Sequence, residues 1–260
     1  MNMLQSAREP SWVVEAYQRG GLEPTDVNLN VEPNVAGLVK LSTTDWPGKL
    51  VAVVFLQGCP WRCTYCHNKD ILDPRSPSKM PWQDVLDFLA KRRGLLDGVV
   101  FSGGEPLLSA ALSDAIQNVA EYGFEIGLHT GGAWPRKLSA LLADDMFDWV
   151  GLDIKHLESH YDKVTGVAAS GRAAYRSLEA VVQSGVNHEV RTTVSPTVHT
   201  RGDVQTLIEH LADYRSPNGN RIQQHVLQEV RPVPVAFPGW RLSDYLADDM
   251  GEFDIQTRAA

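Results

Sequence analysis

Short apolar runs alternate with helical patterns along most of this chain of 260 residues, and this alternation constrains its fold more than any other feature. The runs have the length and the β-branched content of buried strands. Six of them occur, at residues 50–56, 98–101, 124–128, 149–154, 189–194 and 222–230. Strands separated by helices are joined by right-handed crossovers, so the pattern predicts an α/β fold with a parallel sheet.

Four apolar stripes with spacings of three and four residues predict the helices between the strands. They consist of Trp82, Val85, Leu86 and Leu89; Leu108, Leu112, Ile116 and Val119; Leu178, Val181 and Val182; and Val204, Leu207, Ile208 and Leu211. Such a chain forms either an open doubly wound sheet or a partial barrel, and periodicity leaves both open. In either fold the chemistry belongs at the C-terminal ends of the strands.

The expected domain organisation follows from where this pattern begins and ends. Residues 1–33 are rich in proline and glycine and have little apolar periodicity, which predicts an N-terminal extension. Residues 34–240 contain the alternating pattern and form the one expected domain. Residues 241–260 are acidic and predict a tail or a short helix.

Charge and hydropathy argue against several classes of protein. Twenty-four basic against 32 acidic residues give a formal net charge of −8, whereas nucleic-acid binding depends on a basic face. The longest apolar run, residues 50–56, is far shorter than the roughly 20 residues of a membrane-spanning helix. Residues 1–10 lack the pattern of a secretory signal, so we expect a cytoplasmic protein with no membrane or nucleic-acid partner.

All three cysteines of the chain, Cys59, Cys63 and Cys66, follow the first predicted strand in the spacing C-x3-C-x2-C. Three thiolates on one loop can bind three irons of a cubane cluster and leave the fourth iron open to a substrate. A structural zinc site completed by His67 is one alternative, although closed zinc sites usually pair ligand clusters that are far apart in sequence. Inert buried thiols are another alternative, and the close grouping argues against them.

Polar and glycine residues follow the later strands at the same predicted edge of the sheet. They are Gly103, Gly104 and Glu105 after the second strand, His129 and Thr130 after the third, and Asp153 and Lys155 at the fourth. Asp153 and Lys155 are two residues apart, so both side chains point to one face of the strand. A solvated surface ion pair is the ordinary alternative for these two residues.

Two motifs give the chain a family resemblance. The cysteine spacing, with Tyr65 directly before the last cysteine, resembles the signature of the radical S-adenosylmethionine superfamily. Residues 103–106, Gly-Gly-Glu-Pro, match the GGEP motif of that superfamily. The resemblance covers most of residues 35–232 and implies a partial (β/α)6 barrel by analogy.

Further motifs resemble the activating proteins of anaerobic ribonucleotide reductase and of pyruvate formate-lyase. They are TTDWPGKL at residues 43–50, FLQGC at 55–59, YCHN at 65–68 and DIK at 153–155. HTGG at residues 129–132 resembles the D-T-N-G turn of these proteins but departs from it at the first and third positions. The aspartate of that turn helps to hold a monovalent cation in relatives, and His129 would weaken such a site.

The resemblance implies two cofactors, a four-iron four-sulfur (4Fe-4S) cluster and S-adenosyl-L-methionine. Cys59, Cys63 and Cys66 would ligate the cluster. The residues expected to contact S-adenosylmethionine are Tyr65, Gly103, Gly104, Glu105, His129, Thr130 and Arg191, together with Asp153 and Lys155, which are also the candidate catalytic residues. The two glycines have no Cβ atom to block the approach of the methionine ammonium group, and Glu105 could add a negative charge near it.

The implied enzyme cleaves S-adenosylmethionine reductively to a 5′-deoxyadenosyl radical and places a glycyl radical on a partner enzyme. Anaerobic ribonucleoside-triphosphate reductase is the expected partner, and reduced flavodoxin or ferredoxin is the expected electron donor. One alternative is a radical enzyme that acts on a small molecule such as a purine or pterin-derived ring. A third candidate, a non-catalytic iron-sulfur electron-transfer or structural metal protein, would normally cover every iron with cysteine, and the chain has no fourth one.

Overall fold

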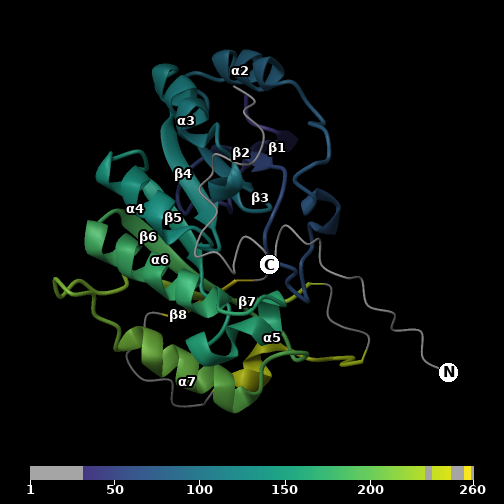
Figure 1. The fold of residues 1–260 in the computed structure, drawn as a ribbon, viewed down its shortest axis with the longest axis vertical. Coiled ribbons are helices and arrows are strands. Elements are labelled where there is room, and N and C mark those ends of the chain that lie inside the picture. Colours follow the sequence, from purple (N-terminus) through teal and green to yellow (C-terminus); the bar gives the residue numbers. More distant parts are fainter. Residues whose placement is uncertain (1–31, 232–235, 247–254, 259–260) are drawn as a thin grey trace.

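One sheet of eight strands is the framework of the chain in its computed structural model, which describes residues 32–231, 236–246 and 255–258. The strands are β1 (Val35–Ser42), β2 (Val51–Leu56), β3 (Gly98–Gly103), β4 (Glu125–Thr130), β5 (Trp149–Asp153), β6 (Asn187–Val194), β7 (His225–Glu229) and β8 (Ile255–Arg258). They follow one another across the sheet in chain order (Figure 1). β1 is antiparallel to β2, and every later pair is parallel.

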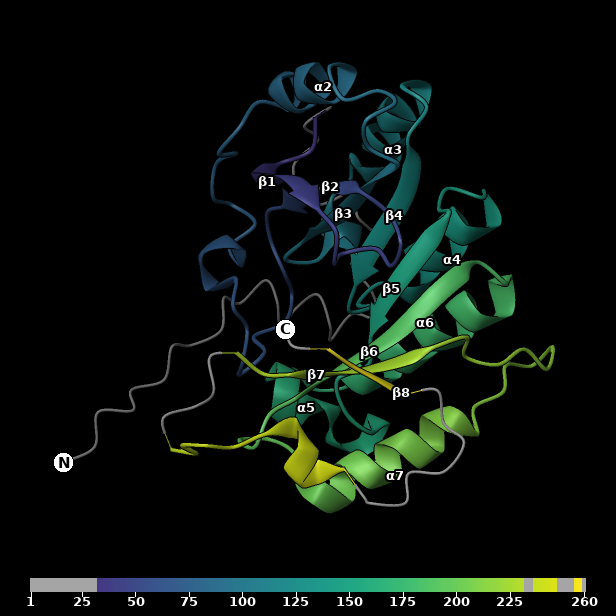
Figure 2. The same cartoon turned by 180° about the vertical axis from the view of Figure 1, so that it is seen from behind.

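Helices connect most of the parallel strands. They are α2 (Trp82–Ala90), α3 (Leu112–Glu121), α4 (Pro135–Ala143), α5 (Tyr161–Thr165), α6 (Ser170–Ser184) and α7 (Arg201–Ala212). Seen from both sides, the sheet curls with α3, α4 and α6 along its outer face (Figure 2). β1 and β8 form its two edges, so the described strands make a partial barrel.

The structure confirms the parallel α/β sheet and the partial barrel, and it adds elements that periodicity missed. The six predicted strands correspond to β2–β7, and the four predicted helices correspond to α2, α3, α6 and α7. β8 adds a seventh parallel strand to the six that the sequence predicts. β1 was not predicted because its buried and exposed residues do not alternate, and three of its residues are exposed.

The segments outside the expected domain have two different outcomes. Residues 1–31 of the expected extension lie outside the described part of the chain. Residues 241–260, expected as a tail or a short helix, contain the short 3-10 helix η5 (Leu242–Tyr245) and strand β8. The sheet therefore extends into a segment in which the sequence gives no strand pattern.

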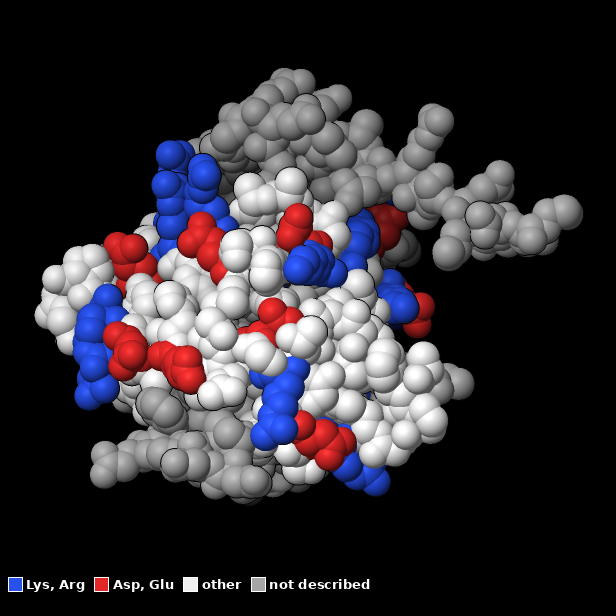
Figure 3. Space-filling model, turned by 90° about the horizontal axis from the view of Figure 1, so that it is seen from below, with Lys and Arg blue, Asp and Glu red and all other residues white. Residues whose placement is uncertain are grey.

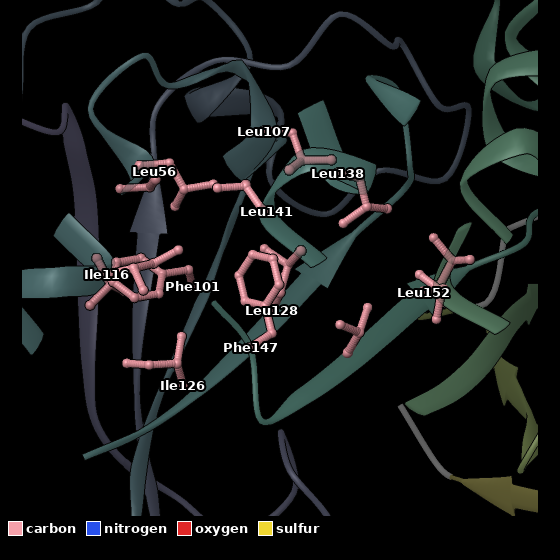
Figure 4. Close-up of a cluster of buried hydrophobic side chains, with 14 of the residues drawn as sticks. Leu56, Phe101, Leu107, Ile116, Ile126, Leu128, Leu138, Leu141, Phe147 and Leu152 are labelled. Atoms are coloured by element: carbon pink, nitrogen blue, oxygen red, sulfur yellow. The ribbon is translucent and has the colours of Figure 1, made fainter. Parts of the chain in front are cut away.

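The main core lies between the helices and the outer face of the sheet. Alternate strand residues such as Leu56, Phe101, Leu128 and Leu152 project to that side and are almost completely buried (Figure 4). Their neighbours along each strand project to the inner face, because successive side chains of a strand alternate. The inner face is thus the surface on which the strand ends can build a site.

The surface charges and the helix lengths bear on two expectations from the sequence, on nucleic-acid binding and on membrane spans. On the face shown in Figure 3, acidic and basic side chains lie next to one another over the described residues. Among the helices that the structure describes, none has the length and apolarity to cross a membrane.

Candidate active site

The parallel register brings the predicted site residues to one edge of the barrel. The cysteine loop follows β2, the Gly103–Glu105 turn follows β3, and His129 and Thr130 end β4. Asp153 ends β5 and is directly paired in register with Arg191 of β6. Side chains from five consecutive strands or their loops therefore meet, as expected where parallel strands end together.

The cysteine loop is held by backbone hydrogen bonds on two sides. The amide of Cys59 donates to the carbonyl of Leu72 at 3.1 Å, within the loop itself. On the other side, the amides of Arg62 and Thr64 donate to the carbonyls of Thr165 and Val164 at 2.8 and 3.0 Å. Helix α5 thus fixes the middle of the loop, although it is distant in sequence.

The three cysteines are all at least partly buried on one loop. Cys59 is buried, and Cys63 and Cys66 are partly buried. Burial raises the pKa of the Cys59 and Cys63 thiols, while the nearby charge of Lys155 opposes this shift at both. A bound metal would stabilise the thiolate forms that burial disfavours. Tyr65, whose hydroxyl is buried without a hydrogen-bond partner, lies directly beside Cys66, so the loop also carries an unsatisfied polar group.

The two glycines of the GGEP turn are required by close packing against the cysteine loop. Gly103 has φ +129°, and a Cβ atom there would lie 2.3 Å from backbone atoms of Leu56. A Cβ atom on Gly104 would lie 2.2 Å from the carbonyl oxygen of Gly58. The amides of Gly104 and Glu105 donate to Leu56 and Gly58 at 3.0 and 2.8 Å. This turn therefore locks onto the start of the cysteine loop.

Glu105 is a buried connector between two turns. One carboxylate oxygen accepts from the Thr130 hydroxyl at 2.6 Å and from the Leu107 amide at 3.1 Å, and the other accepts from the Gly131 amide at 2.9 Å. Burial raises the pKa of this carboxyl, and the three donors oppose that shift. Both oxygens and the Thr130 hydroxyl are thus engaged within the protein, which the sequence did not reveal.

Asp153, Lys155 and Arg191 form one group of charges. The Lys155 Nζ lies 3.1 Å from one carboxylate oxygen of Asp153, and the Arg191 Nε lies 3.3 Å from the other. Burial opposes ionisation of Asp153, but the two cations outweigh it and lower the pKa of the carboxyl. Lys155 is likewise desolvated, and the negative charge of Asp153 nevertheless raises its pKa. All three groups therefore stay charged, with two positive charges around one negative charge.

His129 faces this group from β4. Its Nε2 lies 2.6 Å from the carbonyl oxygen of Asp45 and 3.1 Å from Nη1 of Arg191. Nη2 of the same arginine donates to the carbonyl of Gly151 at 3.2 Å. The guanidinium group of Arg191 thus lies between His129 and Asp153.

Three further residues, Tyr161, Trp61 and Asp45, contact the residues of this site. The Tyr161 hydroxyl donates to the Asp153 carbonyl and accepts from the Lys155 amide, both at 3.1 Å, so it fixes the backbone between them. Trp61 is 2% exposed and packs edge-on against Tyr161. Its ring centroid lies 6.0 Å from Nζ of Lys155. Asp45 reaches His129 from the loop before β2. The contacts of Trp61 with Lys155 and of Asp45 with His129 span distant segments, so no local sequence signal reports them.

Comparisons with known proteins agree with this geometry. The profile of the Radical SAM superfamily matches residues 53–211. MJ1227 of Methanocaldococcus jannaschii, named as a glycyl-radical enzyme activating enzyme, is 31% identical over 190 residues, which are 69% of this chain and 75% of the relative. The pyruvate formate-lyase-activating enzyme of Clostridium pasteurianum is 32% identical over 170 residues, covering 63% of this chain and 69% of the relative.

A solved structure supports the fold. Streptococcus suis SuiB bound to its precursor peptide SuiA superposes with a TM-score of 0.61 at 13% identity, over 80% of this chain and 48% of the SuiB chain. This chain thus matches about half of SuiB. The structural likeness shows only the fold, whereas the sequence matches show the family. The chain belongs to the radical SAM superfamily and, within it, to the glycyl-radical enzyme activating enzymes.

Proposed function

We propose that this chain installs a glycyl radical on an anaerobic partner enzyme, which is anaerobic ribonucleoside-triphosphate reductase. The observation that carries the proposal is the meeting of the three-cysteine loop with the Asp153, Lys155 and Arg191 group at one end of the barrel. When bound, a 4Fe-4S cluster and S-adenosylmethionine supply a 5′-deoxyadenosyl radical that takes a hydrogen atom from glycine.

The residues of the chain bind and orient the cofactor. Cys59, Cys63 and Cys66 would hold the cluster through three of its irons, and the fourth iron would be open to the cofactor. Lys155 presents a fixed positive charge suited to a carboxylate. Trp61 covers one side of the Lys155 ammonium and limits access of water.

Glu105 and the residues around it act as positioning groups. Its carboxylate ties the GGEP turn to the end of β4 through Thr130 and Gly131. Because the same turn hydrogen-bonds to Gly58, a shift at Glu105 would move the cysteine loop. We therefore assign Glu105 to the geometry of the site, in place of a direct charge contact with the cofactor ammonium.

The position of Arg191 supports a site that functions without a monovalent cation. Its guanidinium group lies 3.1 Å from His129 and 3.3 Å from Asp153. A metal cation at this point would be repelled by that group. A histidine at position 129 is compatible with this arrangement, whereas a cation site would favour a carboxylate there.

Radical transfer with two candidate partners tests the function. The anaerobically reconstituted chain is reduced with dithionite or reduced flavodoxin and mixed with S-adenosylmethionine and either anaerobic ribonucleotide reductase or pyruvate formate-lyase. We expect 5′-deoxyadenosine together with a glycyl-radical doublet in the electron paramagnetic resonance spectrum of the reductase. A doublet on pyruvate formate-lyase alone would support that second partner, which the Clostridium pasteurianum relative favours. Cleavage with neither doublet would redirect the search to a small-molecule substrate.

A further inference from the structure

Two histidines and an aspartate form a separate cluster behind the Lys155 side of the active site. His156 follows Lys155 in sequence, His160 ends the short 3-10 helix η4 (Glu158–His160), and Asp203 lies in the first turn of α7. One nitrogen from each histidine and one oxygen of Asp203 lie within 4.8 Å of one another. None of these three residues is needed for the activity proposed above.

The carboxylate of Asp203 is held in place with one oxygen left over. Its Oδ2 accepts hydrogen bonds from the amide and the hydroxyl of Thr200 at 2.8 and 2.7 Å, as the acidic residue of a helix capping box. Its Oδ1 is directed to Nδ1 of His160 at 3.7 Å, beyond hydrogen-bond distance. Oδ1 is therefore held in a fixed position and makes no hydrogen bond to Thr200 or His160.

Both histidines present buried nitrogens that lack hydrogen-bond partners. His156 is completely buried, and its Nε2 has no hydrogen-bond partner, nor has Nδ1 of His160. The Nδ1 of His156 accepts a hydrogen bond from the Leu157 amide at 2.8 Å, so this imidazole is neutral. A buried polar atom without a partner destabilises a fold, and such atoms call for an explanation.

A third histidine, His199, orients the ring of His156 but has no nitrogen left to bind a ligand. The ring of His199 stacks on that of His156 at a centroid distance of 4.8 Å and an interplanar angle of 20°. Both nitrogens of His199 are already engaged, with Ser195 and with the carbonyl of Lys155. The His156 ring is thus held with Nε2 toward His160 and Asp203.

We propose that His156 Nε2, His160 Nδ1 and Asp203 Oδ1 bind a divalent transition metal of the zinc class, with water completing its coordination. Two imidazoles and one carboxylate suit Zn²⁺ and its neighbours, whereas Mg²⁺ and Ca²⁺ require mostly oxygen ligands. The His160 side chain is 39% exposed and can rotate to shorten the longest separation. Metal at Nε2 places the ring hydrogen of His156 on Nδ1, so the hydrogen bond from the Leu157 amide is lost, and metal binding must outweigh this loss.

The metal would join the segment after β5 to the start of α7. His156 is the neighbour of Lys155, and α5, which begins directly after His160, supports the cysteine loop through Thr165 and Val164. The site would therefore stabilise the scaffold behind the active site without contacting substrate. This inference is independent of the partner enzyme and of the radical chemistry.

Zinc binding to the full chain with its cluster intact tests the proposal. The reconstituted protein is incubated with Zn²⁺ under anaerobic conditions and gel-filtered, and zinc and iron are counted by mass spectrometry. We expect about one zinc per chain with iron unchanged, and an X-ray absorption spectrum with nitrogen and oxygen neighbours at about 2.0–2.1 Å. Sulfur neighbours at about 2.3 Å would place the zinc on the cysteine loop and overturn the proposal.

Variants make the assignment specific. His160→Gln and Asp203→Asn should each weaken zinc binding by about tenfold or more in a chelator competition, because each removes a ligand or its charge. His210→Gln changes an exposed histidine on the same helix, α7, and should bind zinc as the unmodified chain does. His160→Gln removes no hydrogen bond and is expected to fold, which circular dichroism verifies. Unchanged zinc affinity in both ligand variants, or no zinc retained by the unmodified chain, would refute the site.

Discussion

The two ends of the inner barrel face differ in chemistry although they are close together, since Trp149 and Asp153 are the first and last residues of the five-residue strand β5. At the N-terminal end, Trp46 stacks on Trp149 at 5.5 Å over Val51, Val53 and Val100, and all five side chains are buried. Toward the C-terminal end, β4, β5 and β6 carry His129, Asp153 and Arg191. One end is closed by apolar packing, and the other carries charges.

This difference shows how a parallel sheet separates stability from chemistry. A Cβ atom on Gly127 would lie 2.9 Å from the Trp46 ring, and one on Gly98 would lie 3.2 Å from that ring and 2.7 Å from the Glu125 carbonyl oxygen, so glycine at both positions leaves room for the indole. The apolar end thus has a fixed shape that excludes water. The charged end stays partly open, with the Asp153 side chain 36% exposed. Changes at the two ends should therefore have separable effects.

The largest effect is expected at the cysteine loop. Changing Cys63 to Ala removes one of three iron ligands, so the chain should lose its cluster, and cleavage of S-adenosylmethionine should be abolished. The measurements are iron per chain after reconstitution, about four in the unmodified protein, and the yield of 5′-deoxyadenosine. The matched control is Thr64→Ala, an exposed neighbour in the same loop, which should retain both. Full iron content in the Cys63 variant would show that the cluster is held elsewhere.

The closed end should control stability. Trp46→Ala empties a packed position, and such substitutions lower the free energy of unfolding by about 3–5 kcal/mol. Denaturant unfolding monitored by circular dichroism measures this loss. Trp46→Phe should recover part of it, and Leu41→Ala, at a side chain that is 59% exposed, should change little. If Trp46→Ala left the free energy of unfolding unchanged, packing at the apolar end would not be what stabilises the fold.

The sequence revealed the charged end much better than the closed end. The strand ends carry their functional side chains within one or two residues of an apolar run, so Asp153, Lys155 and the cysteines could be found by local pattern. Trp46 lies in a loop whose partner, Trp149, is over a hundred positions away, and no periodicity connects them. Helix α4 starts with Pro135 in a short segment, and β8 is only four residues long, so neither gave a clear signal.

Contacts between turns were equally hidden from the sequence. Glu105 matched a motif, and the sequence suggested a charge close to the cofactor. Two of its hydrogen-bond donors, Thr130 and Gly131, are 25 and 26 residues away at the end of the next strand, so only the folded chain shows these contacts. The same holds for His160 and Asp203, which the fold brings together across the β5 and α7 segments.

At the charged end, Lys155 should affect catalysis more than stability. Lys155→Met keeps the apolar stem and removes the positive charge, while Arg191 still balances Asp153 at 3.3 Å. We expect S-adenosylmethionine cleavage to fall by about 100-fold, because the cofactor carboxylate loses its positioning charge. Cleavage kinetics and denaturant unfolding are measured on the same sample, with Lys69→Met at an exposed lysine as the control. A loss of stability as large as that of Trp46→Ala would remove the distinction between the two ends.

The smallest effect is expected from monovalent cations, and it tests how the charged end is neutralised. Asp153 is already paired with Lys155 and Arg191, and Arg191 also faces His129, so Asp153 is not free to bind a metal cation. Replacing Na⁺ with K⁺ or with tetramethylammonium at constant ionic strength should leave the cleavage rate nearly unchanged, since screening by the three salts is equal. His129→Asp supplies a new carboxylate beside Arg191 and serves as the comparison. A strong requirement for Na⁺ or K⁺ in the unmodified chain would mean that Arg191 moves away when cofactor binds, and the charge group would then be rebuilt around a metal ion.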